Sequence, residues 1–235
     1  MMPKPAWLPD EFIQVGLDFS LPQQAKQYDQ YMNRIRDISD ENQKVVSTLK
    51  LTGNESILEI GTGTGELAIF LSSYCRQVHA IDVSDAMLSQ AIAKATLLHA
   101  NNIQFQKGGF LTYAFAPESY DAIVSQLALH HLPDTWKLIA LNRIYKALKS
   151  GGRFYLKDIA YTFAPDRYAV YFDNLISLHK HYYGPEAEKT AITFIKEEYP
   201  TLDWMLTEII TCAGFTIERH TSSQEFISTY ICVKA

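Results

Sequence analysis

The sequence predicts an α/β protein in which helices cover both faces of a mostly parallel sheet. Three observations support this fold class. Short apolar, β-rich runs alternate with longer helical patterns between residues 56 and 159. Most of these runs are apolar almost throughout, as expected for strands that are buried on both faces. A turn with three glycines joins the first run to the first helical pattern.

The elements of this central part follow one another at short spacing. The predicted strands and the helices after them are "SILEIG" with 66–73, "VHAIDV" with 85–100, "IQFQKG", "YDAIVSQ" with 134–149, and "GRFYLKDI". Ser84 is placed to cap the second helix, because serine side chains accept hydrogen bonds from the first free N–H groups of a helix. The pair Gly151 and Gly152 is predicted to end the third helix.

The rest of the chain divides around this core. A last helix over 202–212 stops before Gly214, and the runs "FTIERH" and "FISTYICVKA" predict an antiparallel hairpin at the sheet edge. We therefore predict one domain over residues 1–235, with a core at 51–160. A helical lid at 1–50, an aromatic insertion at 161–200 and the closing helix with its strand pair at 201–235 complete it.

Composition narrows the possible partners and location. The net charge of −5 disfavours binding to nucleic acid, which depends on neutralising phosphates. Three scattered cysteines predict reduced thiols in a cytoplasmic protein, and no apolar run approaches the length of a membrane span. A local basic run is interpreted as a solvated helix face; it consists of Arg143, Lys146, Lys149, Arg153 and Lys157.

The glycine turn "GTGTGE" predicts a binding site for a nucleoside-containing cofactor. A helix start after a strand offers free N–H groups, and glycine lets a ligand approach the backbone. The nicotinamide version of this turn is GxGxxG, and its last glycine allows close helix packing. Here that position is Glu66, whose carboxylate would repel a pyrophosphate. The turn favours a phosphate-free, cationic cofactor, S-adenosylmethionine (SAM), over a dinucleotide.

Two acidic residues support this interpretation. Asp82 ends the second strand about 20 residues after Gly61, where a carboxylate accepts hydrogen bonds from ribose hydroxyls. Glu59 lies within the first apolar run, where a buried carboxylate needs a partner. The methionine ammonium of SAM would be that partner. The alternative is that Glu59 caps a nearby backbone turn.

With four motifs in order, the chain resembles the class I SAM-dependent methyltransferases. The motifs are "ILEIGTGTGELAIFL", "VHAIDVSDAML", "YDAIVSQLALHHLPD" and "LNRIYKALKSGGRFYLKDI". They cover residues 56–159 and look most like the small-molecule branch that includes ubiquinone/menaquinone-biosynthesis enzymes. The resemblance implies a Rossmann-like sheet of seven strands with an antiparallel last strand. It also implies SAM as the cofactor and S-adenosylhomocysteine as its product.

The resemblance assigns most cofactor contacts residue by residue. The residues implied for the glycine loop, the ribose, the adenine face and the methionine end are Gly61, Thr62, Gly63, Gly65, Asp82, Val83, Met87, Ser125, Gln126 and Leu127. One position departs from the family pattern. After the third strand the family has an acidic residue that binds the adenine amino group, but this chain has Gly109 there. We expect backbone groups of Gly109 and Phe110 to meet the adenine instead.

Methyl transfer from a sulfonium requires alignment and exclusion of water, so a general base is optional. The candidates at the carboxyl edge of the sheet are His130, His131 and Asp158. A histidine there is suited to removing a proton from an acceptor, although a structural role is the alternative for both. Asp158 either touches substrate or caps its loop. No metal is expected, because the histidine spacings do not suit a zinc site.

The acceptor must be selected by what covers the pocket. Tyr28 resembles an aromatic that closes over the methionine end of SAM, unless it only packs its helix. Tyr31 is predicted in the same lid, and the aromatic insertion suggests an apolar or planar small acceptor. We expect a monomer or homodimer. Three alternatives stay open: a SAM-binding protein without transferase activity, a methyltransferase acting on protein or RNA, and a nicotinamide oxidoreductase.

Overall fold

The protein is described by a computed structural model that covers residues 5–13, 15–223 and 225–235. The side chain of Tyr31, predicted in the lid, lies outside the described part. The strands are β1 (Ser56–Ile60), β2 (Gln77–Asp82), β3 (Ile103–Lys107), β4 (Tyr120–Gln126), β5 (Leu148–Tyr161), β6 (Thr201–Leu202), β7 (Thr216–Ser223) and β8 (Ile227–Val233). The α-helices are α1 (Pro22–Ile35), α2 (Ile38–Leu49), α3 (Glu66–Ser72), α4 (Asp85–Leu97), α5 (Asp134–Ala147), α6 (Tyr168–Tyr183), α7 (Pro185–Glu197) and α8 (Asp203–Cys212).

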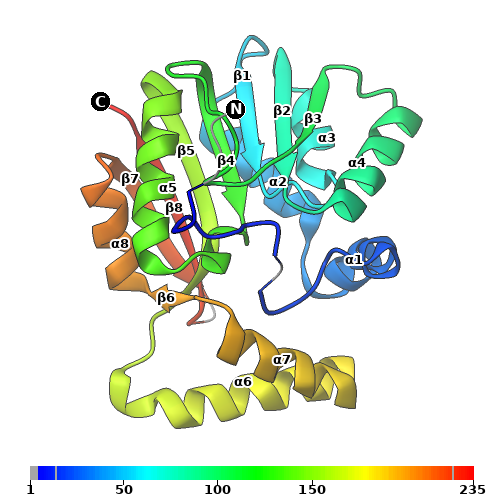
Figure 1. Cartoon of the computed structure of the whole chain (residues 1–235), viewed down its shortest axis with the longest axis vertical. Helices are drawn as coiled ribbons and strands as arrows, with labels where there is room; N and C mark the ends of the chain where they lie inside the picture. Colours follow the sequence, from blue (N-terminus) through cyan, green and yellow to red (C-terminus); the bar gives the residue numbers. More distant parts are fainter. Residues whose placement is uncertain (1–4, 14, 224) are drawn as a thin grey trace.

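The strands form one mostly parallel sheet in the order β3-β2-β1-β4-β5-β8-β7, and β6 pairs with β5 (Figure 1). Strand β8 is antiparallel to both of its neighbours. The predicted fold class is therefore confirmed, with the two-residue strand β6 as an addition. The closing hairpin is also confirmed, but its last strand is interior and β7 forms the edge.

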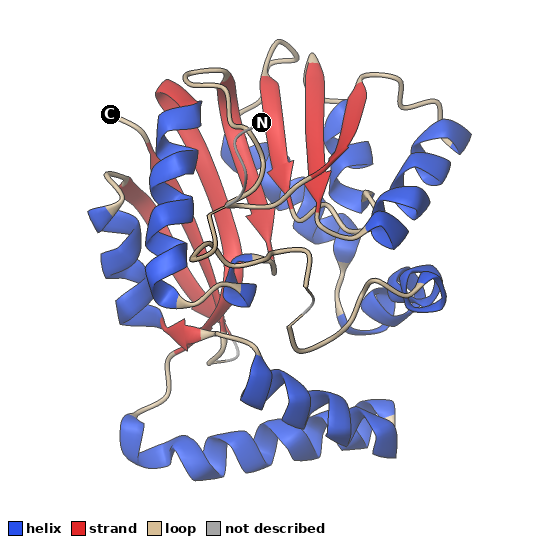
Figure 2. Cartoon of the chain, in the orientation of Figure 1, coloured by secondary structure: helices blue, strands red, loops and turns tan. Residues whose placement is uncertain are grey.

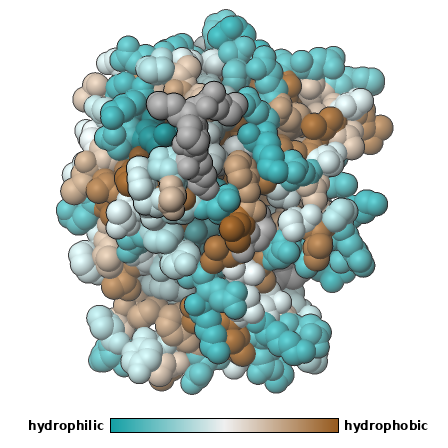
Figure 3. Space-filling view, viewed as in Figure 1, coloured by the Kyte–Doolittle hydropathy of each residue, from teal (hydrophilic) through white to brown (hydrophobic). Residues whose placement is uncertain are grey.

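The sheet is buried on both faces, which explains the continuous apolar runs. Leu58 of β1 points into a core shared with α5 and α8, whereas its neighbour Ile57 packs with α2 and α3. Figure 2 shows helices in front of and behind the sheet. Because adjacent residues of a strand face opposite sides, both faces need apolar side chains. The outer surface in Figure 3 is mostly hydrophilic, with apolar side chains in small separate groups.

The predicted end of the third helix is wrong. Helix α5 ends at Ala147, before the two glycines, and β5 already begins at Leu148. Leu148 pairs with Tyr120, and the register then shifts before Ala122 pairs with Arg153. A Cβ at Gly152 would lie 2.8 Å from the Lys149 carbonyl oxygen. These glycines therefore form an irregularity within the strand and do not cap the helix.

Two segments lie beyond the carboxyl ends of the parallel strands. Helices α6 and α7 form an antiparallel pair there, reached from β5 and leading back to β6 (Figure 1). Residues 5–13 and 15–21, here called the N-terminal strap, cross the same edge before entering α1 (Figure 1). The predicted insertion at 161–200 thus stands at the edge where ligands bind in such folds. Of the predicted lid at 1–50, the N-terminal strap and α1 lie at this edge, whereas α2 packs on a face of the sheet with Ile57.

Candidate active site

The glycine turn after β1 has the backbone conformation that glycine favours. Gly61, Gly63 and Gly65 have φ angles of 77°, 53° and 80°. The N–H groups of Gly61 and Thr62 both donate to the Ile81 carbonyl oxygen, at 2.9 and 3.0 Å, which ties the turn to β2. A Cβ at Gly61 would lie 2.5 Å from the Ala128 Cβ, so only glycine fits between the turn and the loop after β4.

Two adjoining cavities flank this turn. The larger, of about 250 Å³, extends along the ends of β2 and β4 under the N-terminal strap. Its lining includes ten of the predicted cofactor residues: Tyr28, Gly61, Gly63, Asp82, Val83, Met87, Gly109, Phe110, Gln126 and Leu127. The smaller, of about 70 Å³, adds Glu59 and Thr62. Both cavities share Tyr28, Gly61, Gly63 and Gln126, so together they surround one continuous turn.

Two predicted cofactor residues do not line either cavity. Gly65 packs α3 against α4, because a Cβ there would lie 2.8 Å from the Ala91 Cβ. Ser125 is fully buried and donates its hydroxyl to the Ile60 carbonyl oxygen at 3.0 Å. Both residues pack behind the surfaces that line the cavities. Their placement does not support direct contact with a cofactor.

Asp82 is buried at the point where β2 ends and the larger cavity begins. Its Oδ2 accepts a hydrogen bond from the Gly63 N–H at 2.7 Å, and its Oδ1 accepts one from the Ser84 N–H at 2.8 Å. Burial raises the pKa of Asp82, while these backbone donors lower it. Each carboxylate oxygen has a second lone pair, so the side chain remains able to accept from ligand hydroxyls.

Glu59 has a single side-chain donor, the Thr62 hydroxyl at 2.7 Å. Burial raises the pKa of Glu59 to about 8, and nearby Asp82 adds to this effect. In the part of the chain that the structure describes, no lysine or arginine pairs with this carboxyl group. Arg36 lines the same smaller cavity, donates to Gln126 Oε1 at 3.0 Å and is ion-paired with Glu41. The smaller cavity thus has a carboxyl group and a guanidinium on its wall.

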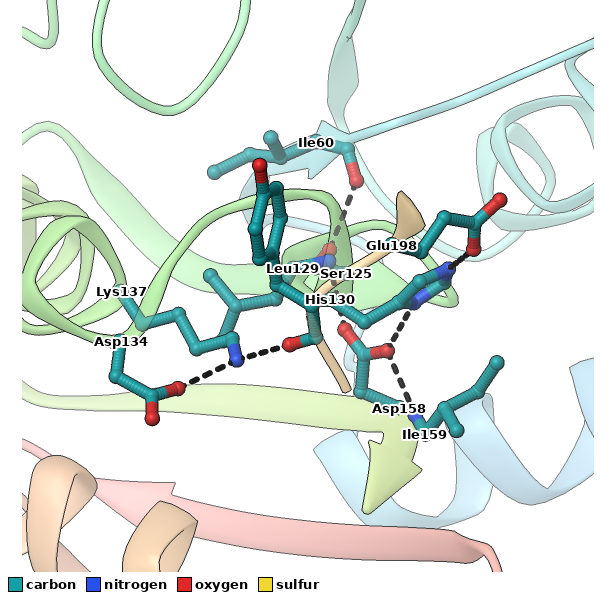
Figure 4. A network of polar contacts seen from close by, with 10 residues as sticks. Ile60, Ser125, Leu129, His130, Asp134, Lys137, Asp158, Ile159 and Glu198 are labelled. Carbon is teal, nitrogen blue, oxygen red and sulfur yellow. Dashed lines mark hydrogen bonds and ion pairs between the residues drawn. The ribbon is translucent and has the colours of Figure 1, made fainter. Parts of the chain in front are cut away.

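A buried network surrounds His130, which is in the 3-10 helix η1 (Leu129–His131) (Figure 4). Its Nδ1 lies 2.6 Å from Asp158 Oδ1, and its Nε2 lies 3.1 Å from Glu198 Oε2. Asp158 also accepts from the N–H groups of Leu129 and Ile159, at 2.6 and 2.7 Å. Burial alone lowers the pKa of His130, but the two carboxylates together raise it to about 9.

The adjacent histidine, His131, is uncharged. His131 lines the larger cavity, and its ring centroid lies 4.4 Å from that of His130. Burial, together with the charge on His130, lowers the pKa of His131 to about 4. Of the three predicted catalytic residues, only His131 therefore faces the cavity as a neutral imidazole. His130 and Asp158 are buried behind it and position the loop.

The His130, His131 and Glu198 side chains each offer a ligand atom, all within 4.8 Å of one another. Both ring nitrogens of His130 are already paired with carboxylates, however. A metal would have to replace those pairs.

Three residues of the site were missed by the sequence analysis: Glu11, Arg36 and Glu198. Glu198 Oε1 accepts from the Leu17 N–H at 3.1 Å, so it joins the N-terminal strap to His130. Glu11 approaches Gly109 from the N-terminal strap. No local spacing marks these side chains, because each meets its partner only through the fold.

Comparison with known proteins finds methyltransferases. A family model described as a methyltransferase domain matches residues 57–152. The chain is 32% identical over 143 residues to an uncharacterized methyltransferase of Geobacillus thermodenitrificans. The alignment covers 59% of this chain and 65% of that relative, which is less than two thirds of its length.

Two solved structures share the fold at low identity. Phosphoethanolamine N-methyltransferase 2 of Haemonchus contortus, in complex with phosphomonomethylethanolamine and S-adenosylhomocysteine, matches with a TM-score of 0.66 and 18% identity, covering 93% of this chain and 61% of that one. A putative methyltransferase in complex with the Trm112 activator of Haloferax volcanii matches with a TM-score of 0.66 and 16% identity, covering 97% and 99%. Residues 57–152 thus form a methyltransferase domain, and the matched relatives together with the sheet order support a class I SAM-dependent methyltransferase.

Proposed function

We propose that this protein transfers the methyl group of SAM to a small organic acceptor bound in the larger cavity. The observation that carries the proposal is the position of this cavity. It runs from Asp82 past the glycine turn to His131 and is covered by the N-terminal strap. If the adenosine part of SAM lies at the Asp82 end of the cavity, the sulfonium methyl points toward the His131 end, where an acceptor is shielded from water.

The charges of the smaller cavity suit the methionine part of SAM. Glu59 is a buried carboxyl group that pairs with no cation among the described residues, and an ammonium group beside it would stabilise its ionised form. Arg36 is a guanidinium on the same cavity wall, which matches a carboxylate. Val83 and Met87, in the larger cavity, are apolar partners for the adenine face. In this arrangement Asp82 accepts from the ribose hydroxyls.

His131 is the proposed general base for acceptors that lose a proton. Its lowered pKa keeps the imidazole neutral at physiological pH, so the ring is able to accept a proton. The positive charge held on His130 by Asp158 and Glu198 maintains that state. His130 and Asp158 act as positioning residues in this proposal.

The lining of the larger cavity favours neutral or cationic acceptors. Among its described lining residues there is no lysine or arginine, whereas Asp10, Glu11 and Asp82 are acidic. An acceptor with a phosphate group would find no countercharge there. We therefore expect phosphoethanolamine compounds to be poor acceptors, although the Haemonchus neighbour was solved with one.

Other parts of the proposal rest on the arrangement of elements. We propose residues 1–50 and 161–200 as a lid over the core at 51–160. The described helices include none with the length and apolar character to cross a membrane. All three cysteines are unpaired, which supports the cytoplasm as the proposed location. The likeness to the ubiquinone/menaquinone branch and a monomeric or homodimeric state stay predictions.

The test has two stages. Calorimetry with SAM and S-adenosylhomocysteine measures binding, and absence of both would overturn the proposal. Release of S-adenosylhomocysteine is then followed with a panel of amines, phenols and phosphorylated amines, and with RNA and protein fractions. Turnover of a small acceptor supports the proposal. Turnover of RNA or protein alone would favour the alternative suggested by the Trm112-bound neighbour, and binding without any turnover would favour a non-catalytic SAM-binding protein.

A further inference from the structure

At Gly109, where this chain departs from the family pattern, the space of the missing side chain is filled by another part of the chain. A Cβ placed on Gly109 would lie 2.7 Å from Glu11 Oε1 and 2.8 Å from a Val83 methyl group. The carboxylate of Glu11 therefore occupies the space into which a side chain at position 109 would extend. Both Glu11 and Gly109 line the larger cavity, beside Val83.

Glu11 is held in this position from two sides. Its Oε2 accepts a hydrogen bond from the Leu111 N–H at 2.8 Å, across 100 residues of sequence. Burial raises the pKa of Glu11, while hydrogen bonds from Leu111 and Thr112 and the nearby Arg143 lower it. The N-terminal strap is itself anchored further along, because the Ser84 hydroxyl donates to the Phe19 carbonyl oxygen at 2.7 Å.

A backbone donor lies next to this carboxylate. The Gly109 N–H donates to the Thr112 hydroxyl at 2.9 Å, so it is already used. For the Phe110 N–H, by contrast, no acceptor is found in the described part of the chain. A carboxylate acceptor beside a free N–H matches the outer edge of adenine, which donates through its 6-amino group and accepts at N1.

We propose that Glu11 is the carboxylate that binds the adenine 6-amino group, and that the N-terminal strap thereby forms part of the cofactor site. This inference rests on the proposed function. The acidic group is delivered by a segment 100 residues away from the loop after β3. Binding of the nucleoside and closure of the N-terminal strap are therefore coupled, since the strap gains a hydrogen bond only when adenine is present.

The experiment compares two ligands that differ at the purine edge. S-Adenosylhomocysteine has the 6-amino group, and S-inosylhomocysteine has an oxygen there with a proton on N1. Calorimetry on the full chain should show that the wild-type protein prefers the adenosyl ligand by at least about tenfold, since a hydrogen bond to a charged group is specific. In Glu11→Ala that preference should fall to about threefold or less, because the acceptor is lost.

Glu11→Gln provides a second variant with the same shape. Its amide has both an acceptor and a donor, so it should narrow the preference by improving affinity for the inosyl ligand. Asp18→Asn is the matched control: it removes one negative charge from an exposed position of the same N-terminal strap and should keep the wild-type preference.

The outcomes separate this inference from the proposed function. If wild-type protein binds neither ligand, the proposed function fails. If it binds S-adenosylhomocysteine but Glu11→Ala keeps the full preference, Glu11 does not contact the amino group. Equal weakening of both ligands in Glu11→Ala would also overturn the inference, because it would show that Glu11 only anchors the strap.

Discussion

His130 and His131 are adjacent in the chain, yet their imidazoles carry different charges. His130 lies between two carboxylates, which raise its pKa to about 9. His131 has burial and a neighbouring cation, which lower its pKa to about 4. A difference in surroundings over a few ångströms thus keeps one ring protonated and the other neutral.

Replacement of His131 tests the proposed base. His131→Gln should lower kcat by about 100-fold or more for an acceptor that must lose a proton, because general-base catalysis contributes on that scale. The Kd for SAM should stay close to the wild-type value, since the side chain lies at the acceptor end. Steady-state kinetics and calorimetry measure the two effects. An unchanged kcat would remove His131 from the mechanism.

Replacement of Glu59 by glutamine should stabilise the unliganded protein but weaken its binding of SAM. Its pKa is about 8 in the folded protein against 4.5 for an ordinary glutamate. The protonated form therefore favours folding, and this contribution is complete below pH 4.5 and is lost as pH rises through 8. Glu59→Gln should stabilise the unliganded protein at pH 8 by about 1 to 3 kcal/mol relative to wild type.

Urea unfolding of both proteins at pH 6, 7 and 8 measures this difference, which should grow with pH. The same variant should bind SAM more weakly, because the amide cannot neutralise the methionine ammonium. If Glu59 only caps the turn through Thr62, the variant will lose stability and its difference from wild type will not depend on pH.

Asp82 is expected to contribute to affinity through the ribose. Asp82→Ala should weaken SAM binding by about 1 to 3 kcal/mol, the scale of hydrogen bonds to a charged group. Calorimetry gives the value, and 2′-deoxyadenosyl homocysteine is a useful second ligand. The variant should discriminate less than wild type between the ligand with and without the hydroxyl. Unchanged affinity for SAM would show that the ribose lies elsewhere.

At the scale of elements, Glu198 connects three segments that are distant in sequence. It follows α7, pairs with His130 of η1 and accepts from Leu17 of the N-terminal strap. Gly16 has a φ angle of 75°, and a Cβ there would lie 2.3 Å from the Glu198 side chain. The close approach explains why glycine occupies that position.

Removal of this carboxylate should loosen all three segments together. Glu198→Ala should reduce the free energy of unfolding by about 3 kcal/mol or more, because His130 loses one of its two buried partners. Its exposed neighbour provides the control, and Glu197→Ala should stay within about 0.5 kcal/mol of wild type. Urea unfolding measures the free energy of unfolding, and limited proteolysis near the strap measures how far the strap is loosened. Equal stability of the two variants would contradict this role.

The elements themselves were largely predictable, and the reason is local. Alternating apolar runs and helical patterns identified every long strand and the helices α3, α4, α5 and α8, because residue periodicity directly reflects burial on the two faces of the sheet. The end of α5 was not predictable in the same way. There, Gly151 and Gly152 follow a helical pattern, but pairing with neighbouring strands decides that they belong to β5.

At the scale of the whole molecule, the ligand-binding edge is formed by segments from the entire chain. The glycine turn and Asp82 come from the core, whereas the N-terminal strap and Tyr199 cover the cavity from either end of the sequence. Figure 1 shows α1 on one side of this edge and the α6–α7 pair beyond it. An acceptor bound there would therefore contact parts of the chain that lie outside the motifs of the core.

The sequence by itself determined the fold class, the cofactor type and most residues around the glycine turn. These depend on local features: strand periodicity, glycine backbone conformation, and the carboxylates at strand ends. The tertiary structure decided which histidine is neutral, where Arg36 and Glu198 lie, and that Glu11 fills the space beside Gly109. Each of these depends on a contact between side chains far apart in sequence, such as the bond between Glu11 and Leu111 across 100 residues, and no local pattern specifies such a contact.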